Sequence, residues 1–550
     1  QYFGIYVYNG HKEGYFMNTG VANSKSIITF GNGRFTILTD RLIRIEYSKD
    51  GEFEDRPSQA FINRNLEVPD FTVKKDNEYI EIETDSLILR YTNSKEGFTG
   101  SNLSIQLKNF NNRIWKMGEN SWGNLGGTAR TLDSVNGETH MDPGLLSRNG
   151  WAVVDDSNTL VYNEENYLEK RKVNRNDLYF FGYGLEYKQC LKDFCKLSGK
   201  VPMIPRWALG NWWSRYWHYT QEELLELMET FKKRNVPLSV CIVDMDWHIV
   251  ENPYSSGWTG YTWNKKYFPD HKDFIEKIHQ LGLKTALNLH PADGVQPHEA
   301  DYSDMAKAMG INPETKEPVY FDCSDANFMK AYFEILHHPK EAEGIDFWWI
   351  DWQQGSVSKV EGLDPLWALN QAHFEDSKRN GKRGFIFSRW AGLGNHRYPI
   401  GFSGDSVVSW ESLRFQPYFT ATAANVGYSW WSHDIGGHYK GIEEEELNLR
   451  WVQFGVFSPI FRIHCSKNEF VDRRPWAYSE TICKNIEEAM RLRHQLIPYI
   501  YSLSYKNYVE DQPFIYPLYH EYPDREEAYR ARDQYFYGSE LMVAPIISKT

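Results

Sequence analysis

Acidic and basic residues follow a series of short apolar segments, each at the point where the segment ends. For example, Asp244 follows residues 238–243, and Asp351 follows residues 345–350. The residues in such positions are Asp244, Asp246, Asn288, His290, Asp351, Arg389, Asp405, His433, Asp434, Arg462 and His464. If the segments are neighbouring parallel strands, their carboxyl ends meet at one face, which is where a parallel barrel keeps its active site.

Paired carboxylates with basic neighbours and nearby tryptophans suit the cleavage of a glycosidic bond. One carboxylate attacks the anomeric carbon, while the other protonates the leaving oxygen and then activates water. A single acid at a strand end is often the N-cap of the next helix. Buried acids neutralised by Arg389, Arg462 and His464 could also form a purely structural network. Acids at four separate strand ends nevertheless favour the catalytic interpretation.

The apolar segments alternate with helices. Thr220 and Glu223 match a capping box at the start of one helix, Asp270 predicts the N-cap of a second, and a third is expected over 326–336. Strands are predicted at 208–213, 238–243, 284–289, 345–350, 384–388, 400–403, 426–429 and 459–462. About eight such strands over roughly 330 residues favour a closed (β/α)8 TIM barrel over an open sheet. No GxGxxG follows a strand, which disfavours a dinucleotide-binding fold.

The first part of the chain has a different pattern. Residues 41–47 and 78–83 alternate between apolar and polar side chains, which is typical of antiparallel strands with one solvated face. In the first of these, Arg44 and Glu46 are expected on the solvated face. The sequence therefore predicts an N-terminal antiparallel β-sandwich over 1–197.

A chain of 550 residues is too long for one core, so several domains are expected. The barrel is predicted over 198–525, with an insertion near 291–324 after its third strand. Residues 526–550 are interpreted as the beginning of a C-terminal β domain. Because residues 540–550 look like a strand entering a new unit, we expect this domain to be incomplete.

Composition narrows the choice of partners. The net charge of −13 and the lack of a Lys/Arg-rich run argue against nucleic acid, and no apolar run approaches the roughly 20 residues of a membrane helix. Aromatic residues make up 16% of the chain, which favours an oligosaccharide partner because flat rings pack against sugar faces. A homo-oligomer is left open.

Six cysteines without a CxxC pair disfavour a disulfide framework or a zinc site. His290 and His298 also match no zinc-ligand spacing, so no metal is predicted. Reduced thiols fit a cytoplasmic protein. A secreted or cell-surface location stays open, because a processed chain would also start, as this one does, without methionine.

Several motifs resemble those of glycoside hydrolase family 31. Residues 347–351 (FWWID) and 401–406 (GFSGDS), the latter followed by 410–413, look like the two signature regions of that family. Further segments are similar to family motifs and occur in the same order, at 126–133, 143–148, 432–437 and 462–464. The resemblance implies retaining hydrolysis of α-linked sugars by a β-sandwich and TIM-barrel enzyme that needs no metal or cofactor.

The resemblance also implies a role for individual residues. Asp351 takes the position of the nucleophile and Asp405 that of the acid/base. The sugar-binding positions are Asp244, Arg389 and His464 for the hydroxyls in subsite −1, Trp349 and Phe402 for its aromatic walls, Asp434 for the pocket floor, and Met245 and Trp352 beside them.

One motif departs from the family pattern. The family commonly has Met-Asn-Glu after the nucleophile, where this chain has Trp352, Gln353 and Gln354. The change removes a charge beside Asp351 and introduces a larger side chain that could narrow the entrance, which leaves the sugar and the linkage open.

The predicted function is an exo-acting α-glucosidase that works with retention. The alternatives are an α-transglycosylase with apolar acceptor subsites, or an α-galactosidase, α-xylosidase or α-N-acetylgalactosaminidase that uses the same two aspartates. A non-catalytic sugar-binding protein would be expected to lose a catalytic acid, and both are present.

Overall fold

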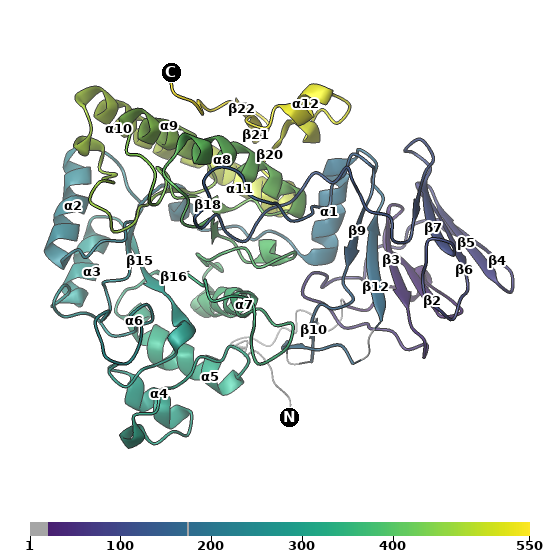
Figure 1. Ribbon diagram of the computed structural model, residues 1–550, viewed down its shortest axis with the longest axis horizontal. Helices are drawn as coiled ribbons and strands as arrows, with labels where there is room; N and C mark the ends of the chain where they lie inside the picture. The colour runs from purple at the N-terminus through teal and green to yellow at the C-terminus, as the bar shows by residue number, and fades with distance from the viewer. Residues whose placement is uncertain (1–19, 165, 173–174) are drawn as a thin grey trace.

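The computed structural model describes residues 20–164, 166–172 and 175–550, and its N-terminal part is a β-sandwich, drawn at the right of Figure 1. One antiparallel sheet has the order β1 (Ile27–Phe30), β2 (Gly33–Ile37), β3 (Leu42–Tyr47), β12 (Asn176–Phe181), β9 (Ala152–Asp155). The other consists of β4 (Phe71–Lys75), β5 (Tyr79–Thr84), β6 (Leu87–Thr92), β7 (Leu103–Leu107) and β8 (Arg113–Lys116). Side chains from both sheets share one apolar core. The predicted sandwich is confirmed.

The prediction that one face of β3 is exposed to solvent is wrong. Arg44 and Glu46 are only 1% and 2% exposed. Arg44 is paired with Asp177 at 2.7 Å, and Glu46 with Arg34 at 2.7 Å. Burial of a charge is tolerated when the charge is paired and hydrogen-bonded. The alternation of polar and apolar residues within one strand does not show whether the fold will bring such partners to its polar side chains.

The second part is a parallel barrel, at the left of Figure 1. Its strands are β13 (Asn211–Trp213), β14 (Val240–Val243), β15 (Lys284–Leu289), β16 (Phe347–Ile350), β17 (Gly401–Phe402), β18 (Trp431–Ser432) and β19 (Phe461–Ile463). Five pair in the order β16-β15-β14-β13-β19, and β17 pairs with β18. Parallel bridges Trp349–Phe387, Ser388–Gly401 and Ser432–Ile460 close the circle, so residues 387–388 hold the place of the fifth strand. The predicted barrel is confirmed.

Two strand positions differ from the sequence prediction. The strand expected at 426–429 is wrong, because residues 423–426 extend α8 (Trp410–Thr422) as a 3-10 helix and the strand follows at 431–432. Gly427 ends that helix with a left-handed φ of 71°, which glycine adopts without strain. The strand expected at 384–388 is reduced to its last two residues. In both places a buried apolar run resembles a strand in composition alone.

Helices surround the barrel (Figure 1). The predicted N-terminal caps are confirmed for α2 (Gln221–Lys233), which begins with the Thr220–Glu223 capping box, and for α3 (His271–Gln280), capped by Asp270. The helix expected at 326–336 consists of α5 (Ala326–Ala331) and a π-helical segment, Tyr332–His337, that continues into α6 (His338–Ala342). The remaining long helices are α1 (Tyr187–Ser198), α7 (Pro365–Ser377), α9 (Glu445–Val456), α10 (Glu480–Gln495) and α11 (Ile497–Glu510).

The predicted insertion after β15 contains α4 (Tyr302–Ala308). The chain ends in a small antiparallel sheet of β20 (Ile515–Pro517), β21 (Tyr535–Tyr537) and β22 (Leu541–Val543), with α12 (Glu526–Arg530) between its first two strands. A C-terminal β unit is therefore present, while the proposed boundaries between the domains stay predictions. Among the described residues, none of the helices has the length and apolar character needed to cross a bilayer.

Candidate active site

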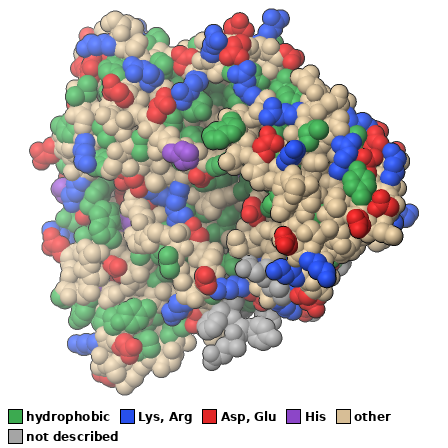
Figure 2. Space-filling view, turned by 45° about the vertical axis from the view of Figure 1, so that its right-hand side comes forward, with side chains coloured by type: hydrophobic (Ala, Val, Ile, Leu, Met, Phe, Trp, Pro, Cys, Tyr) green, Lys and Arg blue, Asp and Glu red, His purple; other side chains and the backbone are tan. Residues whose placement is uncertain are grey.

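The ends of the barrel strands bring most of the predicted site residues together. Asp244 directly follows β14, Asp351 follows β16, and His464 follows β19. Asp434 lies two residues beyond the end of β18, and Asp405 lies three beyond the end of β17. The space-filling view shows the molecule hollowed near the centre of one face (Figure 2). The contacts among these side chains define the site.

Asp351 is buried and held by two basic side chains. Arg389 donates from Nε to Asp351 Oδ1 at 3.0 Å, and His290 Nε2 lies 3.3 Å from Oδ2. Burial alone would raise the pKa of Asp351, but Arg389 and His290 outweigh it and hold that pKa well below its usual range. Asp351 is therefore a carboxylate at any pH near neutrality, as a nucleophile must be.

Asp405 has the opposite electrostatic environment. Loss of water raises the pKa of Asp405 to about 6, and the neighbouring acids Asp434, Asp351 and Asp133 add to this effect, while His438 opposes it. A pair of carboxyl groups whose environments push their pKa values apart is the arrangement that divides nucleophile from acid/base in glycosidases.

A third acid, Asp133, links the two aspartates. Asp133 Oδ1 accepts hydrogen bonds from Arg389 Nη1 at 3.1 Å and from the backbone N–H of Asp405 at 2.8 Å. Because Arg389 also binds Asp351, a chain of three hydrogen bonds joins the two carboxyl-bearing loops. Gly404 permits this approach, since a Cβ there would lie 2.2 Å from Asp133 Oδ1 and 2.5 Å from Arg389 Nη1.

Asp133 belongs to the N-terminal part of the chain, and sequence reasoning missed it as a site residue. The backbone N–H groups of Leu132 and Ser134 bond to the carbonyls of Ser403 and Asp405, at 2.6 and 2.9 Å. The available signal was the family-like segment 126–133, which ends at this residue. A single sequence does not show which side chain a loop contacts 272 positions away.

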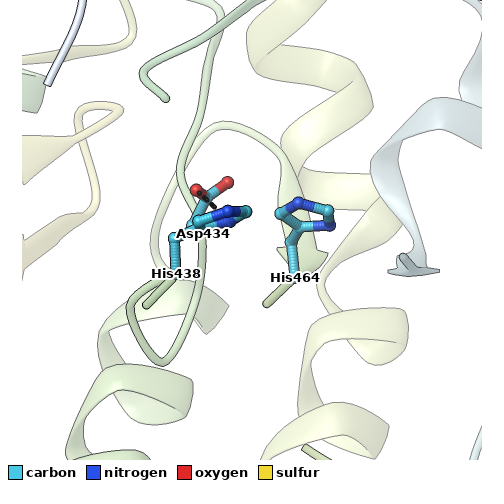
Figure 3. A group of neighbouring side chains, drawn as sticks. All are labelled: Asp434, His438 and His464. Atoms are coloured by element: carbon cyan, nitrogen blue, oxygen red, sulfur yellow. Dashed lines mark ion pairs between the residues drawn. The ribbon is translucent and has the colours of Figure 1, made fainter. Parts of the chain in front are cut away.

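Asp434 lies in a buried cluster with His438 and His464 (Figure 3). Asp434 Oδ1 forms an ion pair with Arg462, and its Oδ2 lies 3.4 Å from His438 Nδ1. His464 faces His438 with the rings 5.0 Å apart. Although the three ligand atoms are close enough to hold a metal ion, Arg462 already supplies the positive charge that Asp434 requires. We therefore interpret the cluster as a network of ion pairs and ring contacts, and the absence of a metal stays a prediction.

His438 is a second residue that sequence reasoning missed. Its Nε2 lies 3.7 Å from Asp405 Oδ2, so it contacts two of the acids at once. It stands one residue beyond the family-like segment 432–437. A histidine in a loop after a strand end is the only signal that could have marked it.

Asp244 is buried beside His464, whose Nε2 lies 3.9 Å from Asp244 Oδ2. Burial raises the pKa of Asp244 to about 7, and the charge of Asp351 contributes to the shift. The next residue, Met245, is buried with a left-handed φ of 42°, a conformation that costs energy for a residue with a side chain and is often found at functional sites. The turn after β14 is thus held in a strained shape at the edge of the site.

The predicted aromatic residues are buried around the same strand ends. Trp349 meets Phe402 edge to face at 5.2 Å and His464 at 5.1 Å, and the guanidinium of Arg389 lies 4.1 Å above Phe402. Trp352 packs on Phe321, from the insertion, at 5.1 Å, and donates its N–H to Gly355 O at 2.7 Å. Trp352 is only 4% exposed, so it packs the insertion against the loop that carries Asp351.

Some buried polar atoms at the site have no hydrogen-bond partner among the described residues. Among them are Arg389 Nη2, Trp349 Nε1 and Asp246 Oδ2. A buried donor or acceptor without a partner costs free energy, and such atoms are expected where a ligand or water completes the bonding. Two donors and one carboxylate oxygen suit the hydroxyl groups of a sugar.

Comparisons with known proteins identify the same kind of barrel. The model of the glycosyl hydrolases family 31 TIM-barrel domain matches residues 201–503, and that of the family 31 C-terminal domain matches residues 511–550. An α-xylosidase of Saccharolobus solfataricus is 25% identical over 475 residues, which cover 79% of this chain and 63% of the relative. Alpha-glucosidase 2 of Bacillus thermoamyloliquefaciens is 27% identical over 447 residues, which cover 75% of this chain and 55% of the relative.

A solved structure shows the same fold. The crystal structure of a family 31 α-xylosidase from a soil metagenome, complexed with xylose, superposes with a TM-score of 0.73 at 18% identity and covers 95% of this chain and 90% of its own. The chain spans less than two thirds of the length of the curated relatives above. On the family models, which together cover most of its length, the chain belongs to glycosyl hydrolase family 31.

Proposed function

We propose that the protein is a retaining, exo-acting α-glycosidase that releases a terminal α-linked glucose. The observation that carries the proposal is the contrast between two neighbouring carboxyl groups. Asp351 is kept charged by Arg389 and His290, whereas Asp405 is kept protonated up to a pKa of about 6 by loss of water and nearby acids. Membership of family 31, whose matched relatives include α-xylosidases and α-glucosidases, supports the same reaction class.

The reaction proceeds in two displacements. In the first, an oxygen of Asp351 attacks the anomeric carbon while Asp405 gives its proton to the leaving oxygen, so the glycosidic bond breaks and a glycosyl ester forms. In the second, Asp405 takes a proton from water, the water oxygen attacks the anomeric carbon, and Asp351 leaves as the carboxylate. Two inversions at one carbon retain the α configuration.

The buried polar side chains are proposed to hold the sugar in subsite −1. Asp244, His464 and Arg389 are the hydroxyl-binding residues, with Trp349 and Phe402 behind them and Asp434 supporting the floor. Asp351, Arg389 and His464 are all nearly inaccessible, which suits a terminal sugar entering a pocket better than a chain crossing an open groove. This burial is the basis for proposing exo action.

An α-xylosidase is the second candidate. Relatives with that name match this chain as well as the α-glucosidases do, at 25% and 27% identity. Xylose lacks the hydroxymethyl group that glucose carries at C5, so the space around that carbon decides between the two sugars. Trp352, which directly follows Asp351 in the sequence, is buried against the insertion, and we propose that it borders this space.

Hydrolysis of nitrophenyl α-glycosides tests the proposal. We expect the α-glucoside to be cleaved faster than the xyloside, the galactoside and the N-acetylgalactosaminide, and Asp351→Ala to remove the activity. Preference for the xyloside would select the second candidate. Activity with a glucose disaccharide that yields mainly longer products would select a transglycosylase. If a folded protein cleaves none of the glycosides or disaccharides, the proposed function is wrong.

A further inference from the structure

His438 occupies a place between two carboxylates that the reaction as described does not use. Its Nε2 lies 3.7 Å from Asp405 Oδ2, and its Nδ1 lies 3.4 Å from Asp434 Oδ2. The imidazole is buried, and His464 covers one of its faces at a ring distance of 5.0 Å. Figure 3 shows His438 and Asp434 side by side on one loop, with His464 opposite them.

We infer that His438 is a positioning residue that carries a positive charge beside Asp405 and sets when that carboxyl holds its proton. The inference rests on the proposed function, because it assigns the acid/base role to Asp405. It adds a residue from the loop after β18 to the proton chemistry of the site.

The charges around Asp405 make such a group necessary. Asp434, Asp351 and Asp133 contribute negative charge to this region, and each opposes the ionisation of Asp405. In the second displacement Asp405 must nevertheless exist as a carboxylate in order to take a proton from water. A cation 3.7 Å away offsets this repulsion and keeps the pKa of Asp405 within reach of neutral pH.

The surroundings of His438 favour its charged form. Burial would lower the pKa of His438, but Asp405 and Asp434 outweigh burial and raise it, and Asp244 adds to this. Tyr439 also packs against His438, at a ring distance of 5.4 Å. His464 is packed against it as well, and burial and Arg462 hold the pKa of His464 well below its usual range, so it remains neutral. Asp434, fixed by Arg462, therefore lies 3.4 Å from one ring nitrogen of His438, while the other ring nitrogen faces Asp405.

His438→Gln tests the inference, since glutamine keeps a polar side chain but carries no charge. Without the cation the pKa of Asp405 rises, so its acid form persists to higher pH. We expect the alkaline limb of kcat/KM to move upward by about one pH unit, which corresponds to a tenfold change in the ionisation equilibrium. At pH values below neutral, we also expect kcat of the variant for an α-glycosyl fluoride to be about tenfold lower than that of the wild type. The reason is that the second displacement needs Asp405 in its carboxylate form.

The matched control is His520→Gln, which removes a buried imidazole that bonds Asn425 at 2.9 Å and lies outside the site. Its pH profile is expected to match that of the wild type. An unshifted alkaline limb in folded His438→Gln would overturn the inference. An inactive wild-type protein would instead overturn the proposed function, so the two failures are distinguishable.

A second measurement does not depend on turnover. The ring protons of labelled histidine report the pKa of His438 by nuclear magnetic resonance, and the signal that is missing from His438→Gln identifies this residue. We expect a pKa above that of an ordinary histidine in the wild type, and a lower one in Asp405→Asn, because the coupling between two sites is reciprocal. The same pKa in both proteins would overturn the inference.

Discussion

At the scale of single residues, the site separates two aspartates by their partners rather than by their own chemistry. Asp351 receives a hydrogen bond from Arg389 and lies against His290, while Asp405 is surrounded by other acids and by His438. Both are the same amino acid at the end of a barrel strand, and the sequence offers no difference between them beyond their motifs. Their neighbours, brought from distant loops, decide which one is charged.

The pKa directions lead to a specific pH dependence. The first displacement needs Asp351 charged and Asp405 protonated, so kcat/KM should fall as pH rises through the pKa of Asp405, which is about 6. On the acid side it should fall only when Asp351, whose pKa is below its usual range, becomes protonated. Initial rates of α-glucoside hydrolysis across pH 3–9 measure this profile. A kcat/KM that stays constant from pH 5 to 9 would contradict the assignment.

At the scale of elements, loops from three parts of the chain pack around the site at the ends of the barrel strands. Segment 131–134 crosses from the N-terminal part to the strand ends, the insertion after β15 packs on Trp352, and the loop after β14 carries an exposed tryptophan. The insertion and the loop after β14 also bury apolar side chains, such as Met305 and Trp263, in the core of the barrel. Loops on a rigid scaffold are where families vary their specificity.

Asp133→Asn tests whether segment 131–134 contributes to the site. The substitution removes the charge that Asp133 presents to Arg389, and hydrogen bonds to charged groups contribute about 1.5–3 kcal/mol. We therefore expect kcat/KM to fall between about tenfold and a hundredfold, with the fold retained by circular dichroism. Asp142→Asn, an exposed acid in the same part of the chain, is the matched control. Equal activity of the two variants would remove Asp133 from the site.

The loop after β14 places Trp258 near Asp351, the proposed nucleophile. Trp258 is 45% exposed, and its ring lies 5.2 Å from that of His290, which itself contacts Asp351. A half-exposed ring at the entrance suits the sugar on the far side of the cleaved bond. We expect Trp258→Ala to raise KM for a glucose disaccharide severalfold and to leave hydrolysis of α-glucosyl fluoride, which has no such sugar, nearly unchanged. Trp122→Ala, which removes a tryptophan that is 89% exposed on the N-terminal part, is the control; equal losses on both substrates would contradict this placement.

At the scale of the whole molecule, sequence patterns predicted the sandwich and the barrel because both arise from local periodicity. The strand at 284–289 and the capped starts of α2 and α3 match the structure residue by residue. The burial of Arg44 and the strand near Trp431 were not predicted, since each depends on partners far along the chain. The same dependence on distant partners explains why the sequence identified Asp351 and Asp405 as candidate site residues but did not identify Asp133 and His438.

The site also opposes the stability of the whole molecule. The pKa of Asp244 is raised to about 7 in the folded state, above the usual value for the unfolded chain, so this group destabilises the fold increasingly as pH rises to about 7 and fully above it. Asp244→Asn should therefore raise the unfolding temperature at pH 8 more than at pH 4, while it lowers sugar affinity. Thermal unfolding at the two pH values measures the effect. A lower unfolding temperature of the variant at pH 8 would contradict the raised pKa.

The most direct test of the account is to trap the glycosyl ester. A 5-fluoro-α-glucosyl fluoride should form the ester quickly and hydrolyse it slowly, and mass spectrometry of the digested protein locates the attached sugar. We expect one sugar on the peptide that contains Asp351, and none on that peptide in Asp351→Ala. A sugar attached to Asp405 instead, or rapid turnover that inverts the anomeric configuration, would contradict the proposed mechanism.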